Sequence, residues 1–400
     1  MVRREGIEPP LPVPKTGALS VKLTARGLSR SVARFSHFDH GECFFARSDA
    51  INSFLLFRIR RPLFYNARMS NSPIAILGAG NMASALALHF ARQGRSVRLY
   101  CIEPDVEDAI NRKHCNPKYL KGHRFPKHIA ASNDIQAVLK NATTVFVAVP
   151  SHAMKEVLIT ARPFLSSKAI VASITKGLNP KTLEPLIYSE TTTLPAALQK
   201  RICFIGGPAI ATEIAKGSPT GLIIAGKNRK SVLHLKHLLQ TETIKCATTH
   251  DLLGVGLASA LKNPYAIALG MCDGLKYPTN AKALVFTIAI DEMAQLLKKA
   301  GANSETIRGL AGLGDLLTTS MSPHGRNRSY GERLVGAKTK DPKKLKIGIV
   351  EGISTTATAV KLSKALKVQT PLLSSVDRCL KRKSGFEKPF LEYLKQLKLS

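Results

Sequence analysis

Short apolar runs separated by helical or loop segments recur along the first part of the chain. Each run is typical of a buried strand, and a helical pattern covers residues 81–93. The runs lie at Ile74–Leu77, Val97–Cys101, Thr144–Val149, Ala169–Ile174, Ile202–Ile205 and Gly221–Ile224. This alternation predicts an α/β fold built on a doubly wound parallel sheet.

The strand pattern stops near residue 250 and helical patterns follow it. Residues 252–301 are typical of long helices, and residues 303–400 of shorter helices broken by glycine-rich turns. We therefore predict a Rossmann-type dinucleotide-binding domain over residues 71–251. An all-helical substrate and catalytic domain is predicted over residues 252–400.

Residues 1–70 have a different composition, with many arginines and serines, few acids and no persistent period. Such a stretch is typical of an organellar transit peptide, or it is an upstream segment included by too early a start codon. Met69 stands just before the first predicted strand, so we favour a start at Met69. In either case we expect residues 1–70 to be disordered and to have no catalytic role.

The chain has a large excess of basic residues, which indicates an anionic partner. The 400 residues carry 59 Lys and Arg against 27 Asp and Glu, a formal charge of +32. That balance suits a phosphorylated substrate, nucleic acid or an anionic lipid surface, or it reflects basic tails alone. The seven cysteines are scattered without a C-x-x-C pair, so we expect neither a disulfide framework nor a metal site. A reducing cytoplasm fits that pattern, and no apolar run has the length of a membrane span.

The first strand runs into the fingerprint Gly78-Ala79-Gly80-Asn81-Met82-Ala83. In a G-x-G-x-x-A turn, Gly78 permits the tight turn and Gly80 lets the backbone approach a pyrophosphate. Ala83 lets the helix pack closely on the strand. A strand before it and a helix after it make this context specific, and the pattern predicts NAD or NADP bound at the helix amino terminus.

The end of the second strand bears on the choice between the two cofactors. Glu103 follows Ala83 by about 20 positions, the spacing of a carboxylate that binds the ribose 2′-hydroxyl of NAD. A solvated glutamate in a turn before Pro104 explains the residue equally well.

Lys262 is the single charge in the apolar stretch from Gly254 to Cys272. A buried ammonium group is costly unless an anion pairs with it, and Asp315 is a candidate partner. Carbonyl reduction needs a donor that polarises and protonates the carbonyl oxygen, which suits such a lysine. A lysine extending to solvent at a helix edge is the alternative. Arg326 and Asn327 offer donors to a phosphate, although a solvated basic turn would have the same composition.

The motifs GAGNMA, VPSH, TKG, GGPAIATEIAKGSPT, LASALKN, GLAGLGDL, GRNR and VEG occur in this order over about residues 72–385. Together they resemble the NAD(P)-dependent glycerol-3-phosphate dehydrogenase family. The resemblance implies reduction of dihydroxyacetone phosphate to sn-glycerol 3-phosphate, which feeds glycerophospholipid synthesis. It implies that Lys262 is the general acid/base. The implied substrate residues are Lys176, Gly207, Asp315, Arg326 and Asn327, with the last two on the phosphate. The implied cofactor residues are Asn81, Met82, Lys176, Ala211, Arg326 and Glu351.

The chain departs from the family pattern at several positions of the expected site. Ala209 and Gly325 stand where the family has hydroxyl residues, and Pro264 follows Asn263 within a predicted helix. Ile288-Ala289 replaces an Arg-Gly pair. Ile102 stands where a basic residue often holds a 2′-phosphate, which favours NAD slightly.

Two other functions remain alternatives at this point. One is a related Rossmann reductase acting on another small keto substrate. The other is an inactive basic Rossmann protein that binds nucleic acid or membrane, although no interleaved aromatics indicate a nucleic-acid groove. We expect a small phosphate substrate and no nucleic-acid partner. The sequence leaves open whether the chain forms a homodimer.

Overall fold

The structure is a computed structural model that describes residues 72–323 and 325–398. The described residues belong to one compact unit. The extension predicted over residues 1–70, with Met69, lies outside the described residues.

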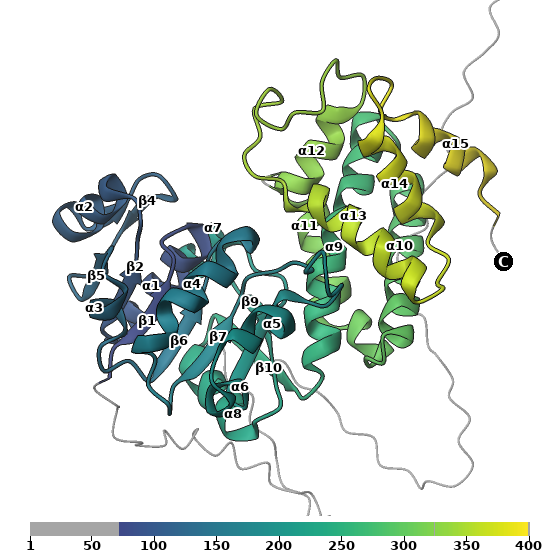
Figure 1. Cartoon of the computed structure of the whole chain (residues 1–400). Helices are drawn as coiled ribbons and strands as arrows, with labels where there is room; N and C mark the ends of the chain where they lie inside the picture. Colours follow the sequence, from purple (N-terminus) through teal and green to yellow (C-terminus); the bar gives the residue numbers. More distant parts are fainter. Residues whose placement is uncertain (1–71, 324, 399–400) are drawn as a thin grey trace, which may run out of the picture. The chain divides into compact units, whose positions relative to one another are not determined.

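One eight-stranded sheet forms the first part of the fold in the described residues (Figure 1). Its strand order is β10 (Ile244–Thr249), β9 (Thr220–Gly226), β8 (Ile202–Gly206), β7 (Ile170–Ser173), β6 (Thr144–Val147), β1 (Ile74–Leu77), β2 (Val97–Tyr100) and β5 (Ile129–Ser132). Each of the six predicted runs is a strand, and the Rossmann-type α/β class is confirmed. Residues 74 and 77 of β1 lie opposite Val97 and Tyr100 of β2, so these strands end at the same sheet edge.

The sheet is not parallel throughout, which corrects the prediction. β9 runs antiparallel to β8, with Ile224 opposite Ile205, and β10 runs parallel to β9. The connection between β8 and β9 holds only the six-residue helix α7 (Ala211–Lys216). Such a helix is about 9 Å long, so it does not return the chain along the strands as a parallel crossover would.

Helices and a small hairpin accompany the sheet. They are α1 (Asn81–Arg92), α2 (Pro104–Lys113), α3 (Ile135–Leu139), α4 (Met154–Ala161), α5 (Leu186–Ser189), α6 (Ala196–Gln199) and α8 (Arg229–Leu239), with the hairpin β3 (Cys115–Asn116) and β4 (Leu120–Arg124). Alternate residues of β1 point to opposite faces of the sheet. Ala75 and Leu77 join one hydrophobic cluster, and Ile74 and Ile76 join another. Both faces are therefore covered, as the continuous apolar runs predicted.

From residue 252 onward the described residues form helices, as predicted (Figure 1). They include α9 (Leu252–Gly274), α10 (Thr279–Lys299), α11 (Asp315–Met321), α12 (Arg326–Leu334), α13 (Glu351–Ala365), α14 (Pro371–Lys381) and α15 (Lys388–Gln396). Helix α9 packs against α10 to α14 and against β8. A Cβ atom on Gly206, the last residue of β8, would lie 2.8 Å from Ser259 Oγ of α9. This close contact brings α9 to the carboxyl end of the sheet.

Helix α9 is also, within the described ranges, the single helix long and apolar enough to meet the criteria for a membrane span. However, 94% of its most apolar window is buried inside the protein, and Lys262 interrupts the apolar sequence. These features are those of a core helix. The helix continues through Pro264, so this residue does not end it.

Candidate active site

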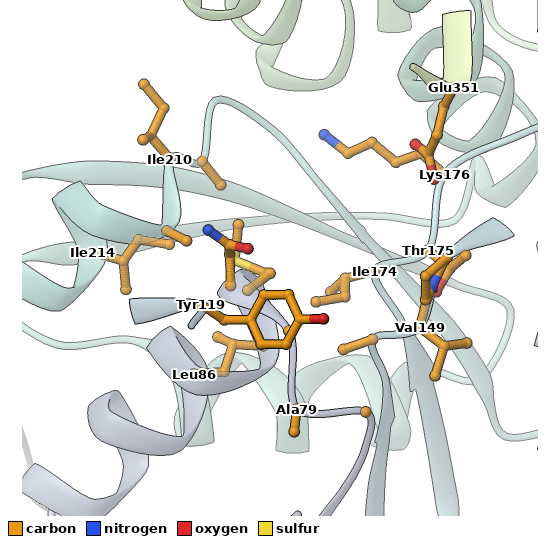
Figure 2. Close-up of a pocket in the computed structure, with 18 of the residues that line it drawn as sticks. Ala79, Leu86, Tyr119, Val149, Ile174, Thr175, Lys176, Ile210, Ile214 and Glu351 are labelled. Carbon is orange, nitrogen blue, oxygen red and sulfur yellow. The ribbon is translucent and has the colours of Figure 1, made fainter. Parts of the chain in front are cut away.

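A cavity of about 1070 Å³ lies at the carboxyl ends of the parallel strands, between these strands and the helical residues (Figure 2). Twelve of the residues predicted from the sequence are on its wall: Gly78, Gly80, Asn81, Met82, Glu103, Lys176, Gly207, Ala211, Lys262, Arg326, Asn327 and Glu351. Ala83 is fully buried within α1, and Asp315 is buried next to the two lysines. The fold therefore gathers into one site residues that span most of the described chain.

The glycine-rich turn has the conformation that its sequence predicts. Gly78 has a φ of 116°, and a Cβ atom there would lie 2.7 Å from the carbonyl oxygen of Ala148. Gly80 precedes α1, and a Cβ atom there would meet nothing within 4 Å. Gly80 and the amino terminus of α1 both line the cavity, and the open space beside Gly80 fits a dinucleotide pyrophosphate.

A second glycine turn borders the same cavity. Gly207 has a φ of 117°, and a Cβ atom would lie 2.7 Å from the carbonyl oxygen of Gly221. Ala211 then begins α7 on the cavity wall. Across the cavity, Glu351 begins α13 and its Oε1 accepts a hydrogen bond of 3.4 Å from the Ser151 amide. This bond links the loop after β6 to the helical residues.

One buried carboxylate binds two lysines that come from different parts of the fold. Asp315 is 2% exposed; its Oδ1 lies 2.5 Å from Lys262 Nζ and its Oδ2 lies 2.5 Å from Lys176 Nζ. Lys262 also donates a 2.5 Å hydrogen bond to Thr319 Oγ1. Two ammonium groups against one carboxylate leave this corner one positive charge in excess, which suits an anionic substrate or a developing alkoxide.

Burial changes the acidity of Lys262. Loss of hydration lowers its pKa to about 8, and the positive charge of Lys176 lowers it as well. The carboxylate of Asp315 opposes both effects. A pKa near the working pH lets a lysine both give up and regain a proton, which is what a general acid/base requires.

A chain of amide hydrogen bonds fixes the part of the cavity wall where α9, α12 and α13 meet. The Gly352 amide donates to Asn327 Oδ1 over 2.9 Å, and Asn327 Nδ2 donates to Asn263 Oδ1 over 2.9 Å. Because a backbone N–H can only donate, it sets the direction of both side-chain amides. Arg326, the first residue of α12, is exposed on the cavity wall beside them.

One departure from the family pattern has a local structural explanation. A Cβ atom on Gly325 would lie 2.5 Å from the carbonyl oxygen of Thr319, so this backbone has no room for a serine. Ala289 is fully buried in α10, beside the half-buried Ile288. Ala209 is on the cavity wall without a hydroxyl group.

Two polar residues that were not predicted as site residues, Thr319 and Asn263, also line the cavity. Thr319 follows Asp315 by one helical turn, so helical spacing could have placed the two side chains on one face. Asn263 follows Lys262 directly in the apolar helix α9, and a polar residue in such a helix could also have indicated a site residue.

A cavity with a dinucleotide-type turn on one wall and a lysine of lowered pKa on another meets the needs of hydride transfer with proton transfer. These features define the class of the protein, an NAD(P)-dependent oxidoreductase.

Comparison with known proteins identifies the family within that class. Residues 73–232 match the model for the NAD-dependent glycerol-3-phosphate dehydrogenase N-terminus, and residues 251–390 match that for the C-terminus. The chain belongs to this family.

Individual relatives agree with the family match. A glycerol-3-phosphate dehydrogenase [NAD(P)+] of Coxiella burnetii (strain RSA 331 / Henzerling II) is 36% identical over 77% of this chain and 92% of the relative. One from Bacillus licheniformis is 34% identical over 77% of this chain and 89% of the relative. The crystal structure of glycerol-3-phosphate dehydrogenase from Coxiella burnetii superposes with a TM-score of 0.76 at 34% identity, over 81% of this chain and 99% of that chain.

Proposed function

We propose that the chain reduces dihydroxyacetone phosphate to sn-glycerol 3-phosphate in the cytoplasm, and so supplies the backbone of glycerophospholipids. The observation that carries the proposal is the Lys262–Asp315–Lys176 arrangement on the wall of a dinucleotide-type cavity. We retain residues 71–251 and 252–400 as the two proposed domains; their boundary falls between β10 and α9. A homodimer remains a further proposal.

The residues of the chain have separate roles in this reaction. Arg326 and the amide of Asn327 bind the substrate phosphate, which places the C2 carbonyl near the two lysines. Lys262 and Lys176 donate hydrogen bonds to the C2 oxygen and stabilise the negative charge that develops on it. Lys262 then gives its proton to that oxygen, and Asp315 holds both ammonium groups in place throughout.

The nicotinamide ring of the bound cofactor supplies the hydride that C2 accepts. The proposed cofactor residues are Gly78, Gly80, Asn81, Met82, Ala83, Glu103, Lys176, Ala211, Arg326 and Glu351. The positive φ of Gly78 and the open side of Gly80 fit a pyrophosphate at the start of α1.

The test is NADH or NADPH consumption, followed at 340 nm, with the full chain and dihydroxyacetone phosphate. Lys262→Met should lower kcat by about 10²- to 10⁴-fold while cofactor binding remains. Lys168→Ala, at an exposed position, serves as the matched control. Turnover without change in Lys262→Met would refute the role of Lys262, and absence of turnover by the wild type would refute the substrate.

A further inference from the structure

The hairpin β3–β4 borders the cofactor end of the cavity and places two side chains on Glu103. Glu103 lies after β2, which ends at Tyr100, and is the N-cap residue of α2. This position faces the adenosine ribose in this fold. Tyr119 OH donates a 2.5 Å hydrogen bond to Glu103 Oε1, and Lys118 Nζ donates to Glu103 Oε2. Each carboxylate oxygen therefore has a donor supplied by the turn of the hairpin.

The hairpin itself is fixed to the glycine-rich turn. Asn116 is fully buried, and its Nδ2 donates to the Ala79 carbonyl oxygen over 2.8 Å and to Ser84 Oγ over 2.9 Å. Its Oδ1 accepts from the Tyr119 amide over 3.1 Å. One buried side chain thus connects the turn proposed for the pyrophosphate with the residue that binds Glu103.

These contacts keep Glu103 ionised and restrict its position. The hydrogen bonds from Lys118 and Tyr119 hold its pKa below the usual value. A hydroxyl group on the ribose can still donate to the carboxylate, because each oxygen has more than one acceptor site. A 2′-phosphate would instead bring about two negative charges beside the Glu103 carboxylate, which Tyr119 holds in place.

We propose that Lys118 and Tyr119 make the chain selective for NAD(H) over NADP(H) by fixing the Glu103 carboxylate at the ribose 2′ position. This inference rests on the proposed function for the position of the cofactor, and not for the identity of the substrate. Lys121 and His123 of β4 also line the cavity, but Lys121 is exposed, and solvent and salt weaken its attraction for a phosphate. Ile102, which is 74% exposed on the same wall, supplies no cation.

The residues proposed to select the cofactor and those proposed to act on the substrate lie in different parts of the cavity. Figure 2 shows Tyr119 and Leu86 in a different part of the pocket from Lys176 and Glu351. Substitutions at the hairpin should therefore change the choice of cofactor without removing the residues proposed to protonate the substrate.

The test measures NADH and NADPH affinity by fluorescence titration of the full chain, together with kcat/KM for each cofactor. Wild type should favour NADH by about tenfold or more. The ribose hydroxyl of NADH donates a hydrogen bond to the Glu103 carboxylate, whereas the 2′-phosphate of NADPH is repelled by it. Glu103→Gln should remove most of this preference, and Tyr119→Phe should reduce it. Lys113→Ala, at an exposed lysine at the end of α2, is the matched control and should leave the ratio unchanged.

The binding titration keeps this test independent of turnover. Equal or tighter binding of NADPH by wild type would overturn the inference, as would an unchanged affinity ratio in Glu103→Gln or in Tyr119→Phe. Clear selectivity for NADH in a protein that does not reduce dihydroxyacetone phosphate would support the inference and refute the substrate instead.

Discussion

Lys176 and Lys262 bind opposite oxygens of one carboxylate, that of Asp315, each at 2.5 Å. Lys176 follows strand β7, whereas Lys262 lies in the middle of α9. The carboxylate therefore joins the sheet to the helical residues at the point where we place the chemistry. The negative charge of Asp315 raises the pKa of Lys262, and the positive charge of Lys176 lowers it. Removal of the Asp315 charge should therefore lower this pKa, and removal of the Lys176 charge should raise it.

The first prediction concerns the pH dependence of reduction. Lys262 must be protonated to act as the acid, and burial lowers its pKa to about 8. We therefore expect kcat/KM for dihydroxyacetone phosphate to be constant near neutral pH and to fall as the pH rises through about 8. Initial rates between pH 6 and 10, in buffers of matched ionic strength, measure this. A profile that is flat across that range would contradict the assignment.

The neighbours of Lys262 provide a second prediction. In Asp315→Asn the attraction that raises the lysine pKa is lost, so the fall in kcat/KM should move to lower pH by about one unit or more. In Lys176→Met a repulsion is lost, so the fall should move to higher pH, although the rate itself decreases. The two pH profiles, recorded with circular dichroism as a check of folding, measure this. Shifts in the same direction in both variants would mean that the charges do not act on Lys262 directly.

The sequence contained strong signals for the central part of the sheet and for the cofactor turn. Strands β1, β6, β7 and β8 are buried at every residue, so continuous apolar residues identified them. Strands β5 and β10 were missed because they lie at the two edges of the sheet. In β10, buried Ile244 and Cys246 alternate with exposed Lys245 and Ala247, which breaks the apolar run.

The site was predictable where a residue type was unusual for its surroundings. Lys262 was such a case, as a lone charge in an apolar helix, and the structure pairs it with Asp315 as proposed. The contacts of Glu103 were not predictable, because they depend on a two-residue strand and a turn at 117–119 without a periodic pattern. Long-range contacts of this kind are set by tertiary packing.

Arg326 provides a third prediction about the substrate phosphate. Arg326→Ala should lower kcat/KM for dihydroxyacetone phosphate by about tenfold to a hundredfold, the usual value of a hydrogen bond to a charged group. Activity with dihydroxyacetone, which has no phosphate, should change little. Arg308→Ala is the control, because Arg308 is an exposed arginine paired with Glu305 away from the cavity wall. Equal losses with both substrates would argue against a phosphate contact.

Gly78 gives a fourth prediction, which concerns the cofactor. In Gly78→Ala the new Cβ atom would lie 2.7 Å from the Ala148 carbonyl oxygen at a φ of 116°, so the turn must move. Strain of this kind costs about 1–3 kcal/mol, and we expect the NADH Kd to rise about tenfold or more. Gly94→Ala is matched, because Gly94 also has a positive φ but no atom within 4 Å of the added carbon. That control should lose some stability and keep the NADH Kd of the wild type.

The last prediction concerns stability and a carboxylate outside the active site. Glu292 of α10 is 3% exposed and accepts hydrogen bonds from Tyr265 OH and from the Leu372 and Leu373 amides at the start of α14. Burial raises its pKa from 4.5 to about 7, so the folded state holds a proton that the unfolded state releases. The resulting stabilisation is complete below pH 4.5 and is lost as the pH rises to about 7.

The comparison that tests this is wild type against Glu292→Gln, which cannot titrate. Within the window from pH 4.5 to 7, the free energy of unfolding of wild type relative to the variant should fall by up to about 1.4 kcal/mol per pH unit. Above pH 7 the difference should be constant, since both states are then ionised in the wild type. Urea unfolding at several pH values measures the difference. Because other ionisable groups are common to both proteins, a difference that stays level across the window would show that Glu292 is not protonated in the folded protein.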